Sequence, residues 1–327
     1  MNAFAHTICQ WYAAYGRDLP WRHTRDPYAV WLSEIILQQT RIAQGTAYWQ
    51  RFMDRFPTVD ALAAATEDEV LRLWEGLGYY SRARNLHAAA RQIVAGGAFP
   101  DTLEGIRSLK GVGDYTAAAI GSICFGVDAA VVDGNVYRVL SRHFGIATPV
   151  GTSAAKREFT ALAESLLPKG EAAAFNQGMM DFGALQCTPL SPACMDCPLQ
   201  GSCNAFATGR TALLPVKKTA AKPQERRLSY VYIRCQGETP IRRRGEGDIW
   251  QGLWEPYVLE EETPAFPGMR PLKSVRHQLT HRTLLADFYL LETPERPQLP
   301  EGYRWIKETE LDLYAKPRLF ELLLEAL

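Results

Sequence analysis

The feature that most constrains this chain is a cluster of thiols. Four of its seven cysteines lie within residues 187–203, which read CTPLSPACMDCPLQGSC and have the spacing Cys-x6-Cys-x2-Cys-x5-Cys. Prolines interrupt the stretch, so it has no room for a helix or strand of useful length. This raises the question of what four thiols bind in one irregular segment.

The rest of the sequence indicates the redox environment of these thiols. The first residues, MNAFAHTICQWYAAYG, lack the basic region and apolar run of a secretion signal, and no segment reaches the roughly 18 apolar residues of a membrane span. We therefore expect a cytoplasmic protein, in which clustered cysteines are more often metal ligands than disulfides. The scattered Cys9, Cys124 and Cys235 are expected to be small buried hydrophobes.

Two kinds of metal site use four thiols. Zinc sites usually pair Cys-x2-Cys knuckles at both ends of a loop, whereas only Cys194 and Cys197 form such a pair here. An iron–sulfur cluster takes four thiolates, often from a single irregular loop. The residues by themselves leave both possibilities open.

The hydrophobic period changes once along the 327 residues, which predicts two domains. Residues 1–206 place apolar side chains three and four positions apart, for example in 59–78 and 153–170, and predict an all-α domain. Residues 207–226 are basic, contain two prolines and predict a linker.

Residues 227–327 predict a second domain of the α+β class. Aromatic and β-branched residues with a period of two predict strands within 227–235, 254–260 and 286–292. An amphipathic helix is predicted over 316–327.

Charge does not predict a nucleic-acid partner, because the net charge is zero and residues 1–210 hold 18 Lys and Arg against 19 Asp and Glu. A hairpin at 109–119, LKGVGDYTAAA, could still bind DNA locally. Gly111 and Gly113 allow a tight turn whose exposed N–H groups, with the start of the next helix, suit a phosphate oxygen. An ordinary connection between two helices is the alternative.

Two carboxylates lie in unusual surroundings. Asp133, in VVDGNVYRVLSR, precedes a glycine and a predicted helix, so it could simply cap that helix. Glu34 lies in the largely apolar DPYAVWLSEIILQQTR. It is either exposed or a buried carboxyl whose pKa is raised enough for it to act as an acid.

Together these motifs resemble a known superfamily. The cysteine spacing resembles the cluster loop of the endonuclease III superfamily of DNA glycosylases, and LxGVGxxTA resembles its helix-hairpin-helix element. The resemblance covers nearly the whole chain and is closest to the MutY-type adenine DNA glycosylases, through WLSExxLQQT, GLGYYxRAxxL and VDGNVxR. It implies an N-terminal all-α glycosylase fold with a [4Fe–4S] cluster, held by Cys187, Cys194, Cys197 and Cys203.

The resemblance also implies roles for the two carboxylates. Glu34 would protonate the departing adenine, and Asp133 would stabilise the sugar cation, since glycosidases meet the same demand with two carboxyl groups in unlike environments. Asn135 and Tyr115 match further active-site positions. Bifunctional relatives carry a Schiff-base lysine where this chain has Tyr115, which favours a monofunctional glycosylase; Lys110 lies in the first half of the hairpin.

Residues around the base pair are implied in the same way. Trp21, Arg22 and Gln177 match positions that line the adenine pocket. Because the target base must leave the helix, other residues must fill the gap. The residues implied to contact DNA are Leu37, Gln39 and Tyr79, with the hairpin residues Gly111 and Gly113.

The second domain resembles the Nudix-related domain with which this family recognises 8-oxoguanine. The matching stretches are GLWEP at 252–256 and VRHQLTHRTL at 275–284. Leu279-Thr280-His281 replaces the family's Phe-Ser-His, so Thr280 keeps the hydroxyl while an aromatic ring is lost. A Glu-rich magnesium-binding run is missing from the sequence, so the domain is expected to bind rather than hydrolyse.

The sequence therefore predicts a monofunctional adenine DNA glycosylase that removes adenine opposite 8-oxoguanine, or opposite guanine, in base excision repair. We expect a monomer that acts on double-stranded DNA in a bacterial-type cytoplasm, in association with the nucleoid. An endonuclease III-type glycosylase and lyase for oxidised pyrimidines is one alternative. A non-enzymatic iron–sulfur protein that binds DNA is the other.

Overall fold

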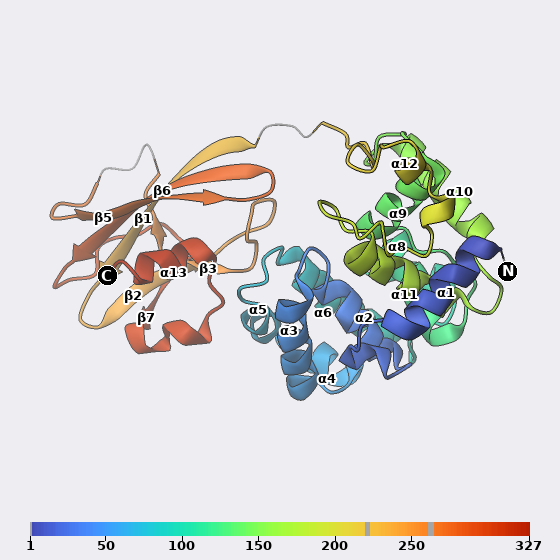
Figure 1. Ribbon diagram of the computed structural model, residues 1–327. Coiled ribbons are helices and arrows are strands. Elements are labelled where there is room, and N and C mark those ends of the chain that lie inside the picture. Colours follow the sequence, from blue (N-terminus) through green and yellow to red (C-terminus); the bar gives the residue numbers. More distant parts are fainter. Residues whose placement is uncertain (1, 220–222, 261–264) are drawn as a thin grey trace. The chain divides into compact units, whose positions relative to one another are not determined.

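The computed structural model describes residues 2–219, 223–260 and 265–327, which form two compact units. The helical unit comprises Met1–Asp60 and Ala88–Thr219, and the mixed unit comprises Ala61–His87 and Ala220–Leu327 (Figure 1). Among the described residues, no helix has both the length and the apolar character needed to cross a membrane.

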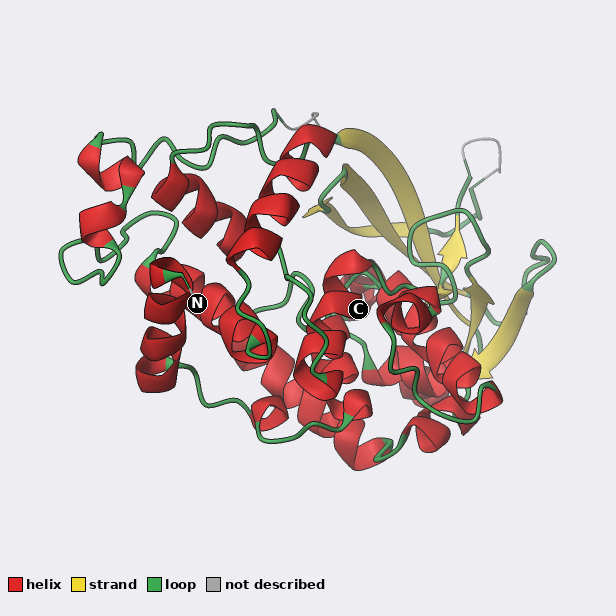
Figure 2. Cartoon of the chain, turned by 90° about the vertical axis from the view of Figure 1, so that its right-hand side faces the viewer, coloured by secondary structure: helices red, strands yellow, loops and turns green. Residues whose placement is uncertain are grey.

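Helices and loops make up the helical unit (Figure 2), as the 3- and 4-residue spacing predicted. Its core is built from apolar faces of α1, α9, α10 and α11, where Ile8, Phe159, Phe175 and Met179 are buried. Two helices, α4 and α6, cross the boundary between the units. The helices of this unit, with those two, are α1 (Ala3–Tyr15), α2 (Pro27–Ile36), α3 (Ile42–Arg55), α4 (Val59–Ala64), α6 (Ser81–Ala95), α7 (Leu103–Ser108), α8 (Asp114–Phe125), α9 (Gly134–Phe144), α10 (Ser153–Leu166), α11 (Ala172–Asp181) and α12 (Asn204–Ala207).

The mixed unit contains two sheets. Strand β1 runs parallel to β6 and antiparallel to β4, and the sheet order is β4-β1-β6-β5; the other sheet has the order β3-β2-β7. Helix α13 (Arg318–Leu324) buries Leu319, Phe320 and Leu323 in a core formed with β1 and β6. The strands are β1 (Gln224–Arg234), β2 (Glu238–Arg243), β3 (Trp254–Glu255), β4 (Tyr257–Val258), β5 (Arg270–Gln278), β6 (Arg282–Glu292) and β7 (Tyr303–Lys307).

The predicted second domain agrees with this unit in class. The three predicted strands fall on β1, on β3 with β4, and on β6. The middle one is broken because Pro256 has no N–H to donate to a neighbouring strand. Strands β2, β5 and β7 had not been predicted.

Residues 61–87 pack with the C-terminal part of the chain. Arg243 forms an ion pair with Glu67 at 2.9 Å, and Arg84 Nη1 donates to the Gln251 carbonyl oxygen at 2.5 Å. This segment includes α5 (Glu67–Leu73), which begins with a capping box at Thr66. The linear limits of 1–206, 207–226 and 227–327 stay a prediction, and residues 220–222 of the predicted linker lie outside the described residues.

Candidate active site and iron–sulfur loop

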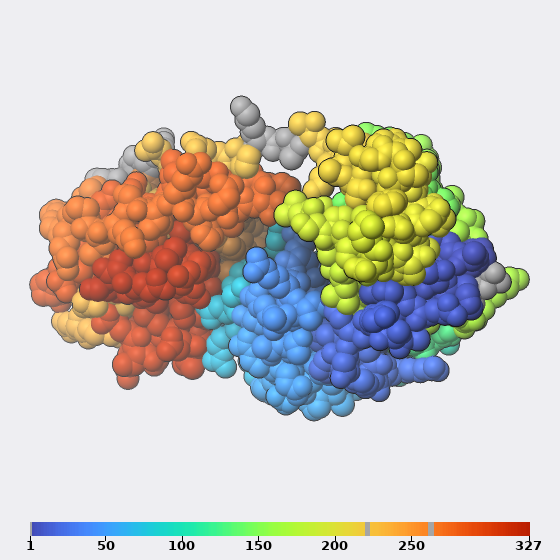
Figure 3. Space-filling view, in the orientation of Figure 1, coloured from blue at the N-terminus to red at the C-terminus, as the bar shows by residue number. Residues whose placement is uncertain are grey.

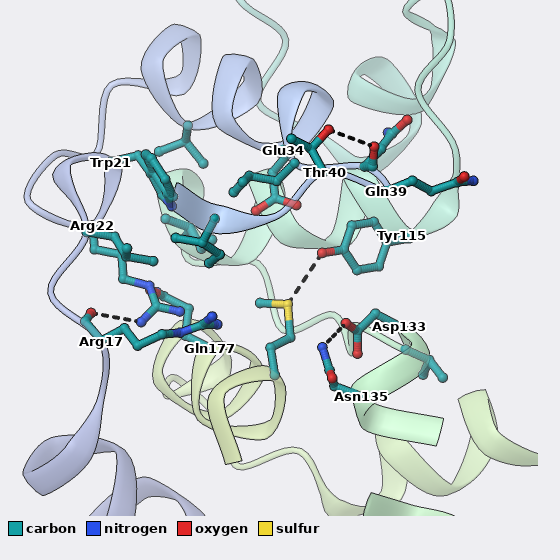
Figure 4. A pocket seen from close by; sticks show the side chains of 18 residues that line it. Arg17, Trp21, Arg22, Glu34, Gln39, Thr40, Tyr115, Asp133, Asn135 and Gln177 are labelled. Carbon is teal, nitrogen blue, oxygen red and sulfur yellow. Dashed lines mark hydrogen bonds between the residues drawn. The ribbon is translucent and has the colours of Figure 1, made fainter. Parts of the chain in front are cut away.

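A cavity of about 550 Å³ opens in the helical unit (Figure 4). Its wall is formed by α2, α8, α9, α11 and a short 3-10 helix, Pro20–Arg22. The structure brings together here all the residues predicted for catalysis and for the adenine pocket, and two of those predicted to contact DNA. They are Trp21, Arg22, Glu34, Leu37, Gln39, Tyr115, Asp133, Asn135 and Gln177.

Glu34 is held in the cavity wall by α2, whose other side chains are almost all buried. Burial raises the pKa of its carboxyl to about 7, and the charge of Asp133 acts in the same direction. A hydrogen bond from Tyr115 and the charge of Arg22 lower that pKa, but they do not outweigh burial. The alternative of an exposed Glu34 is therefore wrong, and the carboxyl can carry a proton near neutral pH.

Asp133 is the N-cap of α9, so the capping alternative is correct, and it lines the same cavity. Its Oδ1 accepts from the Val136 N–H at 2.8 Å, and its Oδ2 accepts from Asn135 Nδ2 at 2.8 Å. Burial raises the pKa of Asp133, while these hydrogen bonds and Arg138 favour its charged form. Burial thus raises the pKa of both carboxyl groups, and the two differ in the groups that oppose it, which are the Val136 N–H, Asn135 and Arg138 at Asp133 but Tyr115 and Arg22 at Glu34.

Tyr115 lies between the two carboxylates in the close-up view (Figure 4). Its hydroxyl donates to Met180 Sδ at 3.3 Å, and the Glu34 carboxyl is the alternative acceptor for the same proton. Burial and both carboxylates raise its pKa well above its usual value, so the hydroxyl stays protonated. It can donate a hydrogen bond to either neighbour, and it offers no amine to attack a sugar.

The far end of the cavity is fixed by residues that the sequence analysis did not single out. Asp181 is fully buried and accepts from Arg22 Nη1 at 2.6 Å and from the Arg17 N–H at 2.8 Å. The Tyr12 hydroxyl donates to Gln177 Oε1 at 2.9 Å. An aspartate at the end of an amphipathic helix gives no signal in one sequence, because only the fold brings it to two arginines.

Gln39 and Tyr79, both predicted to contact DNA, share an uncommon backbone conformation. Their φ angles are +57° and +47°, in the left-handed region that residues other than glycine rarely adopt. Gln39 lies at the cavity of the helical unit, and Tyr79 is 42% exposed in the mixed unit. The Tyr79 hydroxyl hydrogen-bonds to the Thr280 hydroxyl, and His281 beside it is exposed.

The glycine hairpin joins α7 to α8. Gly111 has φ +76° and so needs to be glycine, whereas Gly113 is extended and is the N-cap of α8. A Cβ atom at Gly113 would meet nothing within 4 Å. Both glycines are exposed, so the space in front of the hairpin is open to a ligand.

The four clustered cysteines surround one small cavity. Cys187, Cys194, Cys197 and Cys203 all line a space of about 30 Å³. Among the described residues, no tight group of three or more His, Cys, Asp or Glu side chains encloses a single-ion site. Four sulfurs around a shared space fit a cluster of several atoms. The Arg142 guanidinium donates from Nη1 to Cys187 Sγ at 3.3 Å, and this positive donor suits a sulfur in its thiolate form.

Two arginines of α9 hold the cysteine loop. Arg142 is buried and donates to the carbonyl oxygens of Thr188 at 2.7 Å, Pro189 at 2.9 Å and Leu214 at 3.0 Å. Arg138 donates to the Cys187 carbonyl oxygen at 2.7 Å and to Asn135 Oδ1 at 2.8 Å. The loop itself carries apolar side chains at the surface (Figure 3, yellow-green), with Leu190 96% exposed.

Three known family models match separate parts of the chain. Residues 32–166 match the family described as HhH-GPD superfamily base excision DNA repair protein, and residues 229–326 match the NUDIX domain. Residues 187–203 match the iron-sulfur binding domain of endonuclease III, which confirms the predicted iron–sulfur cofactor. The chain therefore combines a region similar to the HhH-GPD superfamily with an iron–sulfur loop and a Nudix-like domain.

Curated relatives narrow this class. An adenine DNA glycosylase of Buchnera aphidicola from Acyrthosiphon pisum is 35% identical over 254 residues, covering 77% of this chain and 73% of the relative. One from the Baizongia pistaciae strain is 32% identical and covers 86% of this chain and 84% of the relative. The chain belongs to the adenine DNA glycosylase family.

Other similarities cover a smaller share of this chain. The adenine DNA glycosylase of Rattus norvegicus is 43% identical over 66% of this chain, but the match spans only 44% of the rat protein. A thermostable thymine-DNA glycosylase has a similar structure, with a TM-score of 0.58 and 33% identity over 63% of this chain and 95% of that one. A trapped endonuclease III–DNA covalent intermediate, with a TM-score of 0.55 and 24% identity, supports the fold.

Proposed function

We propose that this chain is a monofunctional DNA glycosylase that hydrolyses the N-glycosidic bond of adenine paired with 8-oxoguanine, or with guanine, in double-stranded DNA. The observation that carries the proposal is that Glu34 and Asp133 line one cavity, where burial raises the pKa of both carboxyls and Asp133 in addition accepts two hydrogen bonds at the start of α9. Family membership supports adenine as the base.

The carboxylates divide the chemistry between them. Breaking the bond leaves positive charge on the sugar and negative charge on the base, so protonated Glu34 would deliver its proton to the leaving adenine, at N7. Asp133, whose ionised form is favoured by the start of α9 and by Asn135, would stabilise the sugar cation. Glu34, now ionised, would then take a proton from the attacking water.

The pocket supports binding of a base flipped out of the helix. Trp21 would form one wall, and Gln177 and Arg22 would contact the edge of the base. The Tyr12 hydroxyl accounts for the orientation of Gln177, because it occupies the amide oxygen and leaves the amide NH2 for the base. Tyr115 stands where a lyase would need an amine, which supports simple hydrolysis.

Recognition of 8-oxoguanine is assigned to the mixed unit. Thr280 and His281 lie in the turn between β5 and β6, and Tyr79 is bound to Thr280. Gln39 and Leu37 would enter the duplex at the target. We propose that the protein acts as a monomer in a bacterial-type cytoplasm, close to the nucleoid.

The cluster would have a structural part in this function. When bound, it supplies four thiolate bonds that order residues 187–203. Arg138 and Arg142 hold the same loop from α9, the helix that Asp133 caps. The cysteines do not line the cavity that holds the carboxylates, so no hydrolytic step is assigned to them.

The proposal is tested by incubating the protein with duplexes that hold adenine opposite 8-oxoguanine, adenine opposite guanine, or thymine glycol opposite adenine. Strands are then compared with and without alkali. We expect adenine to be removed and the strand to break only after alkali. Cleavage of the thymine glycol strand without alkali would identify a lyase for oxidised pyrimidines instead.

Variants separate catalysis from binding. Glu34→Gln should abolish excision and still bind the 8-oxoguanine duplex. Glu104→Gln, which removes an exposed carboxylate from α7, serves as the matched control and should keep full activity. An active Glu34→Gln variant would contradict the acid role. If neither DNA cleavage nor base release occurs with any duplex, a non-enzymatic DNA-binding protein is the better description.

A further inference from the structure

A second cavity of about 880 Å³ lies in the helical unit beside the one that holds the carboxylates, and Tyr115 and Val132 line both. The end of the glycine hairpin at Gly113 and the start of α10 also line the second cavity. Two cations, Arg107 and Lys156, face it from α7 and α10.

These two cations are already occupied by a carboxylate of the protein. Lys156 Nζ lies 2.7 Å from Asp114 Oδ2, and Arg107 Nη1 lies 3.5 Å from Asp114 Oδ1. Asp114 is the first residue of α8 and directly follows Gly113. All three side chains are more than half exposed, with exposed fractions of 57% for Asp114, 60% for Arg107 and 65% for Lys156.

The surroundings that attract this carboxylate also suit a phosphate. Two cations converge on it, and the positive end of α8 lies directly behind it. Lys156, followed by Arg107, keeps the pKa of Asp114 below its usual value, so the group remains charged. Residues 1–210 as a whole offer DNA no net positive charge, because they have no excess of Lys and Arg, and the cysteine loop has neither.

We propose that Asp114 occupies, in the free protein, the position that a phosphate of the DNA backbone takes in the complex. Asp114 would have to give up Arg107 and Lys156 when DNA binds, and its own charge would oppose the incoming phosphate. It thereby limits affinity for DNA of any sequence. The inference rests on the proposed function only in taking DNA as the ligand.

The test is Asp114→Asn, measured by equilibrium binding to an undamaged duplex of about 25 base pairs over a series of salt concentrations. Removing the competing charge should lower the dissociation constant about three- to tenfold at 0.1 M salt. It should also steepen the dependence of log affinity on log salt by about 0.9 for each added phosphate contact. Unchanged binding would overturn the proposal. Weaker binding would also overturn it, because Asp114 would then be holding Arg107 and Lys156 in the positions that bind DNA.

Two further variants separate the site from net charge and from folding. Asp101→Asn adds the same charge at an exposed position outside both cavities and should change affinity less than twofold. Asp114→Asn combined with Lys156→Gln should lose most of the gain. If Asp101→Asn raised DNA affinity as much as Asp114→Asn, or if the double variant kept the full increase in affinity, Lys156 and Asp114 would not form the proposed phosphate site. Thermal unfolding of each variant checks that it is folded.

This experiment does not depend on excision. Because it uses undamaged DNA, tighter binding by Asp114→Asn would stand even if no duplex lost adenine. Conversely, adenine removal with unaltered binding by Asp114→Asn would leave the proposed function intact and remove this inference.

Discussion

Glu34 shows how a single side chain can be useful because it is placed badly for stability. The apolar helix α2 buries its carboxyl, and burial exceeds the opposing effects of Tyr115 and Arg22 on its pKa. A carboxyl with a raised pKa holds a proton at a pH where an exposed one has lost it. The property that suits an acid therefore carries a cost for folding.

That cost gives a prediction with a definite sign. The folded pKa of Glu34, about 7, exceeds its unfolded value of 4.5, so the native state binds more protons and loses stability as pH rises between these values. Glu34→Gln removes the titration. The difference in free energy of unfolding between Glu34→Gln and the wild type should therefore shift in favour of the variant as pH rises. From pH 5 to pH 8 this shift should amount to about 1–3 kcal/mol.

Chemical denaturation at several pH values measures this difference. Glu104→Gln again serves as the control, since that carboxylate is exposed, and it should show no comparable change with pH. A Glu34→Gln advantage that stays constant from pH 5 to pH 8 would contradict the raised pKa.

At the scale of elements, α9 connects the two sites of the helical unit. Asp133 caps its start, and Arg138 and Arg142 follow at positions from which they reach the cysteine loop. Arg138 also holds Asn135, which in turn donates to Asp133. One helix thus fixes a carboxylate at one end and the path of residues 187–189 along its side.

Arg138→Lys tests this connection. A lysine cannot donate simultaneously to Asn135, Gly183 and Cys187 in the geometry of the guanidinium, so Asn135 should lose its support. Loss of a hydrogen bond to a charged group costs about 1.5–3 kcal/mol, so the single-turnover rate of excision should fall about tenfold or more. DNA affinity and iron content are measured in parallel.

The matched control is Arg157→Lys, an exposed position on α10 that should not change the rate. A fall in DNA affinity without a fall in the single-turnover rate would show that Arg138 acts on binding alone and not through Asp133.

The elements also show what a single sequence can predict. Helices of the first 206 residues follow from 3- and 4-residue spacing, and the cysteine, hairpin and WLSE motifs point to side chains that meet in two cavities. Tyr12 was missed because a tyrosine on an amphipathic helix resembles any core residue. Asp181 was missed because only the fold brings it to Arg17 and Arg22. Strands β2, β5 and β7 were missed because charged residues and prolines interrupt their alternation.

At the scale of the whole molecule, the units do not follow the order of the sequence. Residues 61–87 read as a continuation of the helical domain, and only tertiary contacts assign them to the mixed unit. Lys316 N–H, for example, donates to Glu75 Oε1 at 3.1 Å. Hydrophobic periodicity indicates whether a segment is a helix or a strand, but not which other segments it packs against. The packing of residues 61–87 with the C-terminal residues could therefore not be predicted from the sequence.

Gly252 tests the packing of that segment. Its φ is +83°, and a Cβ atom there would lie 3.2 Å from both Leu71 Cδ1 and Glu67 Oε1. Gly252→Val should therefore destabilise the mixed unit by about 1–3 kcal/mol through backbone strain and crowding. Hydrogen exchange should then quicken in residues 67–87 as well as in the sheets.

Gly245→Ala is the control, because a Cβ atom there meets nothing within 4 Å. Faster exchange confined to the C-terminal sheets in Gly252→Val would show that residues 67–87 are stabilised by other contacts.

Arg142 gives the cysteine loop a second attachment besides its thiols. A zinc finger stays unfolded until its metal arrives, because the metal is its core. Here a buried guanidinium also donates to three carbonyl oxygens, two at the start of the cysteine loop and one at Leu214 beyond it. The start of the loop is therefore tied to α9 by hydrogen bonds of the protein as well as by whatever its thiolates bind.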